Sequence, residues 1–254
     1  MGSEMCIRDR HFANIRETLS SLIQKAFDQL GDRKVAPMIT GSGGLTLAKH
    51  LDVPFVQEVI SVSTALQHYA PQTDVAIELG GEDAKIIYFE GGNVEQRMNG
   101  SCAGGTGAFI DQMAGLLGVT PDEMNDLALK AEKTYPIASR CGVFAKSDIQ
   151  PLLNQGARKE DISASIFQAV VDQTVSGLAQ GRKIGGQVLF LGGPLTYLSA
   201  LRKAFRTTLN LDEEHAILPE NSSCYMAFGA ALHADTLACL LYTSPSPRDL
   251  STSR

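Results

Sequence analysis

The sequence predicts a mixed α/β fold, and three observations support this class. Short apolar runs typical of strands alternate with longer segments whose apolar residues recur at helical spacing. Glycine-rich turns join the two kinds of segment, and the chain has 24 Gly against 10 Pro and no Trp. A chain of 254 residues that is 44% hydrophobic can also bury a substantial core. We therefore expect one large domain or two smaller ones.

Charge and hydropathy exclude several classes of protein. The formal net charge is -6, and no long block of like charges interrupts the chain, which argues against binding to a phosphate backbone. No apolar run approaches the roughly 18 residues of a membrane span. Residues 1–10 carry charges where a signal peptide needs an apolar stretch. We therefore expect a soluble, cytoplasmic protein with neither nucleic acid nor membrane among its partners.

The two ends of the sequence differ in character from the rest. Residues 240–254 are rich in Ser, Pro and Arg and show no structural period, which predicts a disordered tail. Both this tail and residues 1–10 resemble peptides translated from sequencing-adapter DNA, so we expect both to be artefacts, with a natural tail as the alternative. On this interpretation residues 11–239 are a fragment of a longer protein.

The first part of this fragment predicts three helices and one strand. Residues 14–30 place apolar side chains on one side at helical spacing, and Gly31 ends the helix. Residues 35–40 predict a buried strand, followed by a glycine turn and a short helix over residues 45–50. A further helix is expected over residues 58–69.

The middle of the chain predicts strands first and then helices. Residues 74–79, 85–89 and 94–98 predict three short strands, the last two of which form a hairpin around a glycine turn. Helices are expected over residues 107–117 and about 161–178, where apolar residues recur at helical spacing.

The last part predicts one more strand between helices. Residues 187–191 form an apolar run typical of a buried strand, which leads into a glycine turn and a helix up to about residue 209. A final helix is expected over about residues 225–237. This alternation of strands and helices is that of an α/β protein.

Three glycine-rich turns are candidates for binding a nucleotide. Glycine lets backbone N–H groups approach an anion, and a helix that begins behind the turn adds a favourable partial charge. None of the turns matches the P-loop or the dinucleotide fingerprint, and each alone fits plain strand-to-helix geometry. Together they favour a phosphate, with carboxylates beside the first turn that hold Mg²⁺ partly through water. The residues are Gly80, Gly81, Glu82 and Asp83 with Glu78 close behind, then Gly104, Gly105, Thr106 and Gly107, and finally Gly192 and Gly193.

The chain has five cysteines, which suit reduced thiols or metal ligands better than a disulfide framework. Cys102 directly precedes the second glycine turn, and Cys141 precedes a predicted helix start. A thiolate at a helix N-terminus is a better ligand or nucleophile. Two such cysteines from each chain of a twofold dimer would supply the four thiolates of an iron-sulfur cluster. The alternative is that both are small buried apolar residues, as we expect for Cys224.

Four segments carry a family resemblance. They are residues 80–83, 99–107, 139–148 and 190–193. In content and order these segments resemble the activator ATPases of 2-hydroxyacyl-CoA dehydratases, which belong with the ATPase subunits of benzoyl-CoA reductase (BadF/BadG/BcrA/BcrD type). This family lies in the superfamily of acetate kinase, sugar kinases, Hsp70 and actin. The resemblance covers residues 11–237 and implies an actin-like, ribonuclease H-like α/β fold.

The resemblance implies an electron-transfer function in anaerobic metabolism. Family members are homodimers with one 4Fe-4S cluster at the subunit interface, which here implies Cys102 and Cys141 of both chains as its ligands. ATP and Mg²⁺ would bind in the cleft between two lobes. ATP hydrolysis would let the cluster pass a low-potential electron to a partner iron-sulfur dehydratase or reductase. Reduced ferredoxin or flavodoxin is the expected donor.

The resemblance also divides the chain and assigns roles to its residues. Residues 11–72 with 225–239 would form a partial first lobe, and residues 73–224 would form the second lobe with the cluster ligands. Three carboxylates would order Mg²⁺ and water for catalysis, while the turns would admit the nucleotide. The catalytic residues are Glu78, Glu82 and Asp83, and the nucleotide-binding residues are Gly80, Gly81, Gly104, Gly105, Thr106, Gly107, Gly192 and Gly193.

The sequence departs from the family pattern in three places. The first phosphate loop, Asp-x-Gly-Ser/Thr, is absent, which predicts an N-terminal truncation and impaired ATP hydrolysis by this chain. Glu78 and Glu82 stand where short activators carry Asp and Gln, and Lys146 and Asp148 stand where they favour Glu. In these features the chain is more similar to the long CoA-activase-like proteins.

Two alternative functions stay open. The first is a small-molecule kinase of the same superfamily, which needs a carboxylate as general base, and Asp111 and Asp148 are the available acids. The second is a non-catalytic lobe that senses a nucleotide.

Overall fold

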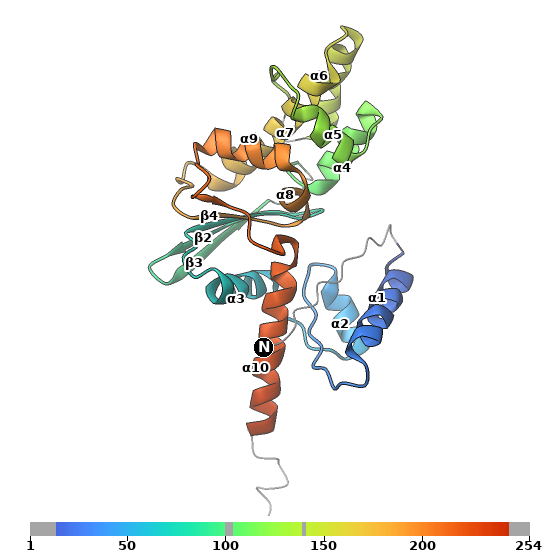
Figure 1. Ribbon diagram of the computed structural model, residues 1–254, viewed down its shortest axis with the longest axis vertical. Helices are drawn as coiled ribbons and strands as arrows, with labels where there is room; N and C mark the ends of the chain where they lie inside the picture. The colour runs from blue at the N-terminus through green and yellow to red at the C-terminus, as the bar shows by residue number, and fades with distance from the viewer. Residues whose placement is uncertain (1–13, 100–103, 139–140, 244–254) are drawn as a thin grey trace, which may run out of the picture. The chain divides into compact units, whose positions relative to one another are not determined.

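The structure, a computed structural model, describes residues 14–99, 104–138 and 141–243. It confirms the mixed α/β class, and the chain divides into two compact units (Figure 1). One unit contains the residues up to Ser61 together with those from Met226 onward, and the other is Val62–Tyr225. That these units correspond to two actin-like lobes stays a prediction.

A five-stranded sheet forms the centre of the larger unit. Its strands are β1 (Val75–Leu79), β2 (Ala84–Glu90), β3 (Asn93–Met98), β4 (Val188–Leu191) and β5 (Ala216–Ile217), in the order β3-β2-β1-β4-β5. The first three strands pair antiparallel, as the predicted hairpin requires, whereas β1 and β4 pair parallel. Because parallel strands end at the same edge of a sheet, the turns that follow β1 and β4 come together there.

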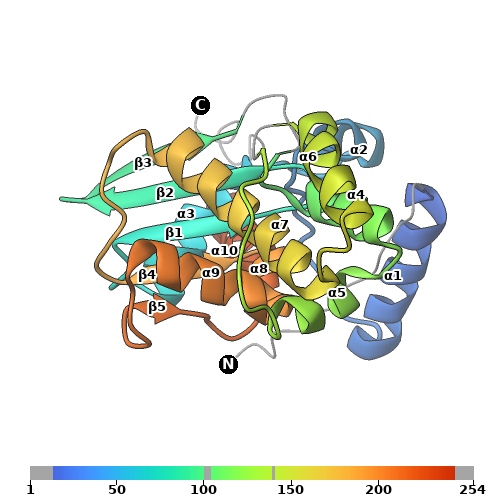
Figure 2. The ribbon, with the colours of Figure 1, turned by 90° about the horizontal axis from the view of Figure 1, so that it is seen from above.

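Helices lie on one side of this sheet, and the hydrophobic core lies between them and the strands. They are α4 (Gly107–Leu117), α5 (Pro121–Ala128), α6 (Gly142–Asn154), α7 (Lys159–Thr174), α8 (Gly193–Tyr197) and α9 (Ser199–Leu209). Figures 1 and 2 show α7 and α9 lying across the sheet. Fully buried aromatic rings pack between the two layers, and the rings of Phe190 on β4 and Phe205 on α9 lie 5.8 Å apart. Burial of each such ring stabilises the fold by about 2 kcal/mol.

Two helices predicted as continuous are interrupted. The helix predicted over residues 161–178 is α-helical to Thr174 and continues as a π-helical turn, Val175–Ala179. The helix predicted to extend to Leu209 is divided into α8 and α9 at Leu198, whose backbone is extended. Leu198 packs into the hydrophobic core, and this tertiary contact overrides the local helical pattern.

The smaller unit contains α1 (Ile15–Leu30), α2 (Gly44–Leu51), the start of α3 (Glu58–Tyr69) and most of α10 (Tyr225–Thr243). The helices predicted here are confirmed. The strand predicted over residues 35–40 is wrong, because these residues form only a single bridge between Ile39 and Phe55. The described residues of this unit offer no neighbouring strand that would extend this bridge into a ladder.

Residues 131–138, which we call the connector, join α5 to α6 without regular secondary structure. Side chains replace the hydrogen-bonding partners that a helix or sheet would supply. The backbone N–H groups of Glu132 and Lys133 donate to Oδ1 of Asp161 on α7, at 2.9 and 3.3 Å. These bonds lower the pKa of Asp161, since its charged form accepts them.

We predict that Asp161 makes the stability of the fold depend on acid pH. A carboxylate whose pKa is lowered on folding contributes stability above its unfolded pKa and loses that contribution as pH falls through the folded pKa. Asp161→Asn should therefore lower stability near neutral pH and flatten its decline below about pH 4. Urea unfolding between acid and neutral pH measures both effects. Asp111→Asn, at an exposed carboxylate on α4, is the control and should leave both stability and its decline unchanged. An unchanged decline in Asp161→Asn would contradict the prediction.

Candidate functional site

The three glycine turns of the sequence meet at the carboxyl ends of β1 and β4. A Cβ atom at Gly192 would lie 2.1 Å from the carbonyl oxygen of Leu79, so the third turn touches the end of β1. The start of α4 joins them, because a Cβ atom at Gly107 would lie 3.1 Å from the Gly80 oxygen and 3.3 Å from Cγ of Pro194. Ligands of open α/β sheets bind in the crevice beyond the carboxyl ends of the strands.

Some backbone donors of these turns are already used within the protein. The Gly80 N–H donates to the carbonyl of Asp83 at 2.8 Å, and the Gly107 N–H donates to the carbonyl of Gly80 at 2.9 Å. By contrast, the N–H groups of Gly81 and Gly193 donate to no atom of the described residues. Gly193 is also the first residue of α8. These two N–H groups are therefore candidate donors to an anion.

The second turn is packed inside the protein. Gly104, Gly105 and Thr106 are all buried, and Thr106 is the N-cap residue of α4. A Cβ atom at Gly105 would lie 3.3 Å from Cγ of Gln173 on α7. The turn therefore fixes α4 against α7, and contact between its residues and a nucleotide stays a prediction.

Two of the three carboxylates beside the first turn lie near the same lysine side chain. Glu78 and Lys85 are only 4% and 3% exposed, and Nζ of Lys85 lies 3.9 Å from Oε2 of Glu78. The same ammonium lies 3.8 Å from Oδ2 of Asp83, whereas Glu82 is exposed. Sequence reasoning missed Lys85, although a lysine within an otherwise apolar strand was the signal. A role for the three carboxylates with Mg²⁺ stays a prediction.

Cys141, one of the two predicted cluster ligands, stands at the start of a helix. Cys141 is the N-cap residue of α6, with extended backbone, and its thiol is half-buried and forms no disulfide. A helix N-terminus stabilises a thiolate, so this position suits a ligand of a metal or cluster. Cys102 lies outside the described residues. Within the described part of the chain, no three His, Cys, Asp or Glu side chains gather closely enough to hold a metal ion.

The two acids considered as general bases have different environments. Oδ2 of Asp148 accepts a hydrogen bond from the backbone N–H of Ala138 at 2.8 Å, so this carboxylate holds the end of the connector against α6. Asp111 is exposed on α4. Neither environment resembles that of a buried, activated base.

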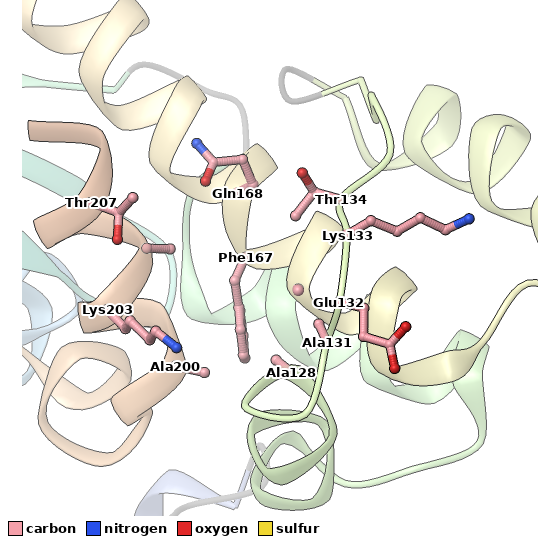
Figure 3. Close-up of a pocket in the computed structure, with 12 residues that line it drawn as sticks. Ala128, Ala131, Glu132, Lys133, Thr134, Phe167, Gln168, Ala200, Lys203 and Thr207 are labelled. Atoms are coloured by element: carbon pink, nitrogen blue, oxygen red, sulfur yellow. The ribbon is translucent and has the colours of Figure 1, made fainter.

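A cavity of about 310 Å³ lies apart from the glycine turns, between α5, α7, α9 and the connector (Figure 3). Small side chains form much of its lining, with Phe167 at its base and Lys203 directed toward it. It contains none of the predicted site residues. In the part of the chain that the structure describes, no helix has the length and hydropathy needed to cross a bilayer.

Glycine turns gathered at the ends of two parallel strands, with some N–H groups that donate to no atom of the described residues, are typical of the class of α/β proteins that bind nucleotides. Residues 6–234 match the model of the BadF/BadG/BcrA/BcrD ATPase family. The chain belongs to this family.

Relatives in sequence and structure agree with this assignment. The chain is 34% identical over 165 residues to the (R)-2-hydroxyglutaryl-CoA dehydratase activating ATPase of Acidaminococcus fermentans, covering 65% of this chain and 62% of that protein. The chain thus spans less than two thirds of this relative. The crystal structure of component A of the A. fermentans dehydratase superposes with a TM-score of 0.79 at 27% identity, over 88% of this chain and 86% of that one. The activator of the 2-hydroxyisocaproyl-CoA dehydratase from Clostridium difficile with bound ADPNP gives a TM-score of 0.76 at 25% identity, over 90% and 85%.

Proposed function

We propose that this protein is an ATP-dependent activator that passes low-potential electrons to an iron-sulfur 2-hydroxyacyl-CoA dehydratase or a related reductase. The observation that carries the proposal is the place of Cys141, a free thiol at the N-terminus of α6, in a protein of this ATPase family. Reduced ferredoxin or flavodoxin is the proposed donor. The proposed compartment is the cytoplasm.

The proposed cluster ligands are Cys102 and Cys141 of two chains related by a twofold axis. Four thiolates complete a 4Fe-4S site, and when bound the cluster would supply a one-electron carrier of low potential. Cys141 suits this role because it is a half-buried, free thiol at the start of α6.

An apolar surface beside Cys141 supports a second copy of the chain as the partner. Val143 and Phe144 are 70% and 66% exposed, although the next residues inward, Ala145 and Ile149, are buried against the core. Exposed apolar side chains that adjoin a functional residue are typical of an interface. A second copy placed on this surface would bring its own cysteines toward Cys141.

The proposed nucleotide site is built from the glycine turns. The N–H groups of Gly81 and Gly193 would donate to phosphate oxygens, and Glu78, Glu82 and Asp83 would order Mg²⁺ and water. Lys85, between Glu78 and Asp83, would balance part of the carboxylate charge before the cation binds.

Anaerobic purification tests the proposed function. We expect a brown dimer with about four irons and four labile sulfides per pair of chains. Iron and sulfide analysis together with sedimentation equilibrium give these numbers. A protein that stays colourless after cluster reconstitution would contradict the proposal.

We predict that Phe144→Glu weakens the dimer. A carboxylate on this surface would be desolvated by the second copy, so the dissociation constant should rise by about tenfold or more. Stability of the monomer should change by less than about 0.5 kcal/mol because the side chain is exposed. Sedimentation equilibrium measures the first effect and urea unfolding the second. Leu129→Glu, at another exposed apolar residue, is the matched control and should leave the dimer intact. If Phe144→Glu and wild type dimerise equally, this surface is not the dimer interface.

A further inference from the structure

The first glycine turn and α4 are bonded into one unit. The N–H groups of Gly107 and Ala108, the first two residues of α4, donate to the carbonyls of Gly80 and Gly81 at 2.9 and 2.7 Å. A Cβ atom at Gly107 would lie only 3.1 Å from the Gly80 oxygen and 3.3 Å from Cα of Gly81, so the turn and the helix start are in close contact. A displacement of the turn is therefore transmitted to the start of α4.

Further along, α4 touches the start of α6. A Cβ atom at Gly142 would lie 2.4 Å from Oε1 of Gln112 and 3.9 Å from Cδ2 of Phe109, both on α4. Gly142 is the first residue of α6 and directly follows Cys141. The Gln112 side chain thus lies against the peptide next to the Cys141 thiol.

We infer that Gln112 is a positioning residue that connects the nucleotide turns to Cys141. The inference rests on the proposed function and adds a structural path by which the nucleotide acts on the proposed cluster ligand. Occupation of the first turn moves α4, and Gln112 transmits this movement to Gly142 and the thiol. Another bond at α6, from the Ala138 N–H to Asp148, joins the connector to this helix and involves no nucleotide turn.

The side chain of Gln112 is well suited to transmit movement without stabilising the fold. Gln112 is exposed on α4, whereas Phe109, beside it on the helix, is buried in the core. Removal of an exposed side chain typically changes stability by less than about 0.5 kcal/mol. Variants at Gln112 should therefore fold normally, and a loss of coupling can be separated from a loss of structure.

The test measures the alkylation rate of Cys141 in the cluster-free protein, with and without Mg²⁺ and ADPNP. Iodoacetamide labelling followed by peptide mass spectrometry reports Cys141 separately from Cys224, which serves as the internal reference. We expect the nucleotide to change the Cys141 rate by about fivefold in wild type, the lower end of typical coupling between sites. In Gln112→Ala the change should fall below about twofold, with nucleotide affinity unaltered.

Two further variants separate the contact from general effects. Gly142→Ala places a Cβ only 2.4 Å from Oε1 of Gln112 and forces that side chain away. It should therefore reproduce the loss, and adding it to Gln112→Ala should cause no further change. Gln150→Ala, at an exposed glutamine bonded to Asn154 on α6, should behave as wild type.

The outcomes of the labelling test can be distinguished from those of the test of the proposed function. A nucleotide effect in Gln112→Ala equal to that in wild type, or no effect in wild type, would overturn the inference. Iron analysis of the anaerobic protein decides the proposed function independently, because the labelling uses the cluster-free chain.

Discussion

Gly192→Ala is expected to destabilise the larger unit by about 4 kcal/mol and to abolish nucleotide binding. Gly192 has φ of +87°, where a side chain is strained, and its Cβ would overlap the carbonyl carbon and oxygen of Leu79, at 2.8 and 2.1 Å. The backbones at Gly192 and Leu79 cannot move apart without separating β4 from β1. Urea unfolding and ADPNP titration measure the two effects.

Gly118→Ala is the matched control for this prediction. Gly118 also has a positive φ, +68°, but a Cβ there would meet no atom within 4 Å. Gly118→Ala should therefore lower the free energy of unfolding only by the backbone strain, about 1 kcal/mol, and leave ADPNP binding unchanged. Equal losses in the two variants would show that the contact between the turns is not what requires glycine at position 192.

Cys141→Ala is expected to remove the iron of the purified protein, from about four per dimer to less than one. The substitution takes two of the four proposed thiolates from each dimer. Cys141 is half-buried, so the chain should remain folded, which circular dichroism checks.

Cys224→Ala is the control for the loss of iron. Cys224 is also a half-buried free cysteine, but it is the last residue of a short 3₁₀ turn, Ser222–Cys224, directly before α10. It should retain full iron. Full iron in Cys141→Ala would exclude this thiol as a ligand and would leave a nucleotide-binding fold without the proposed redox centre.

The periodicity of apolar residues predicted most elements of the sheet and of the helices that pack on it. It failed where a segment needs a neighbouring strand to form a ladder. β1, β2 and β4 are largely apolar runs that are each followed by glycine, so their burial could be predicted. Residues 35–40 are a similar run, yet they make no ladder because strand formation requires a neighbour. α5 was missed, although Thr120 and Glu123 form a capping box at its start.

The candidate site was predicted as a set of turns, but its internal bonding was not. Glycine spacing indicated the turns after β1 and β4 and before α4, and the structure brings them into contact. Sequence could not show that the Gly107 N–H donates to Gly80 while the Gly81 N–H donates to no atom of the described residues, because both depend on contacts between distant segments. The same applies to Gln112 and Gly142, which are on different helices.

The most direct test of nucleotide control over an interface cluster is electron paramagnetic resonance of the reduced, anaerobically purified dimer before and after addition of Mg²⁺ and ATP. The account predicts the signal of a reduced 4Fe-4S cluster whose line shape and midpoint potential change when the nucleotide binds. A signal that is absent, or that is identical with and without nucleotide, would contradict it.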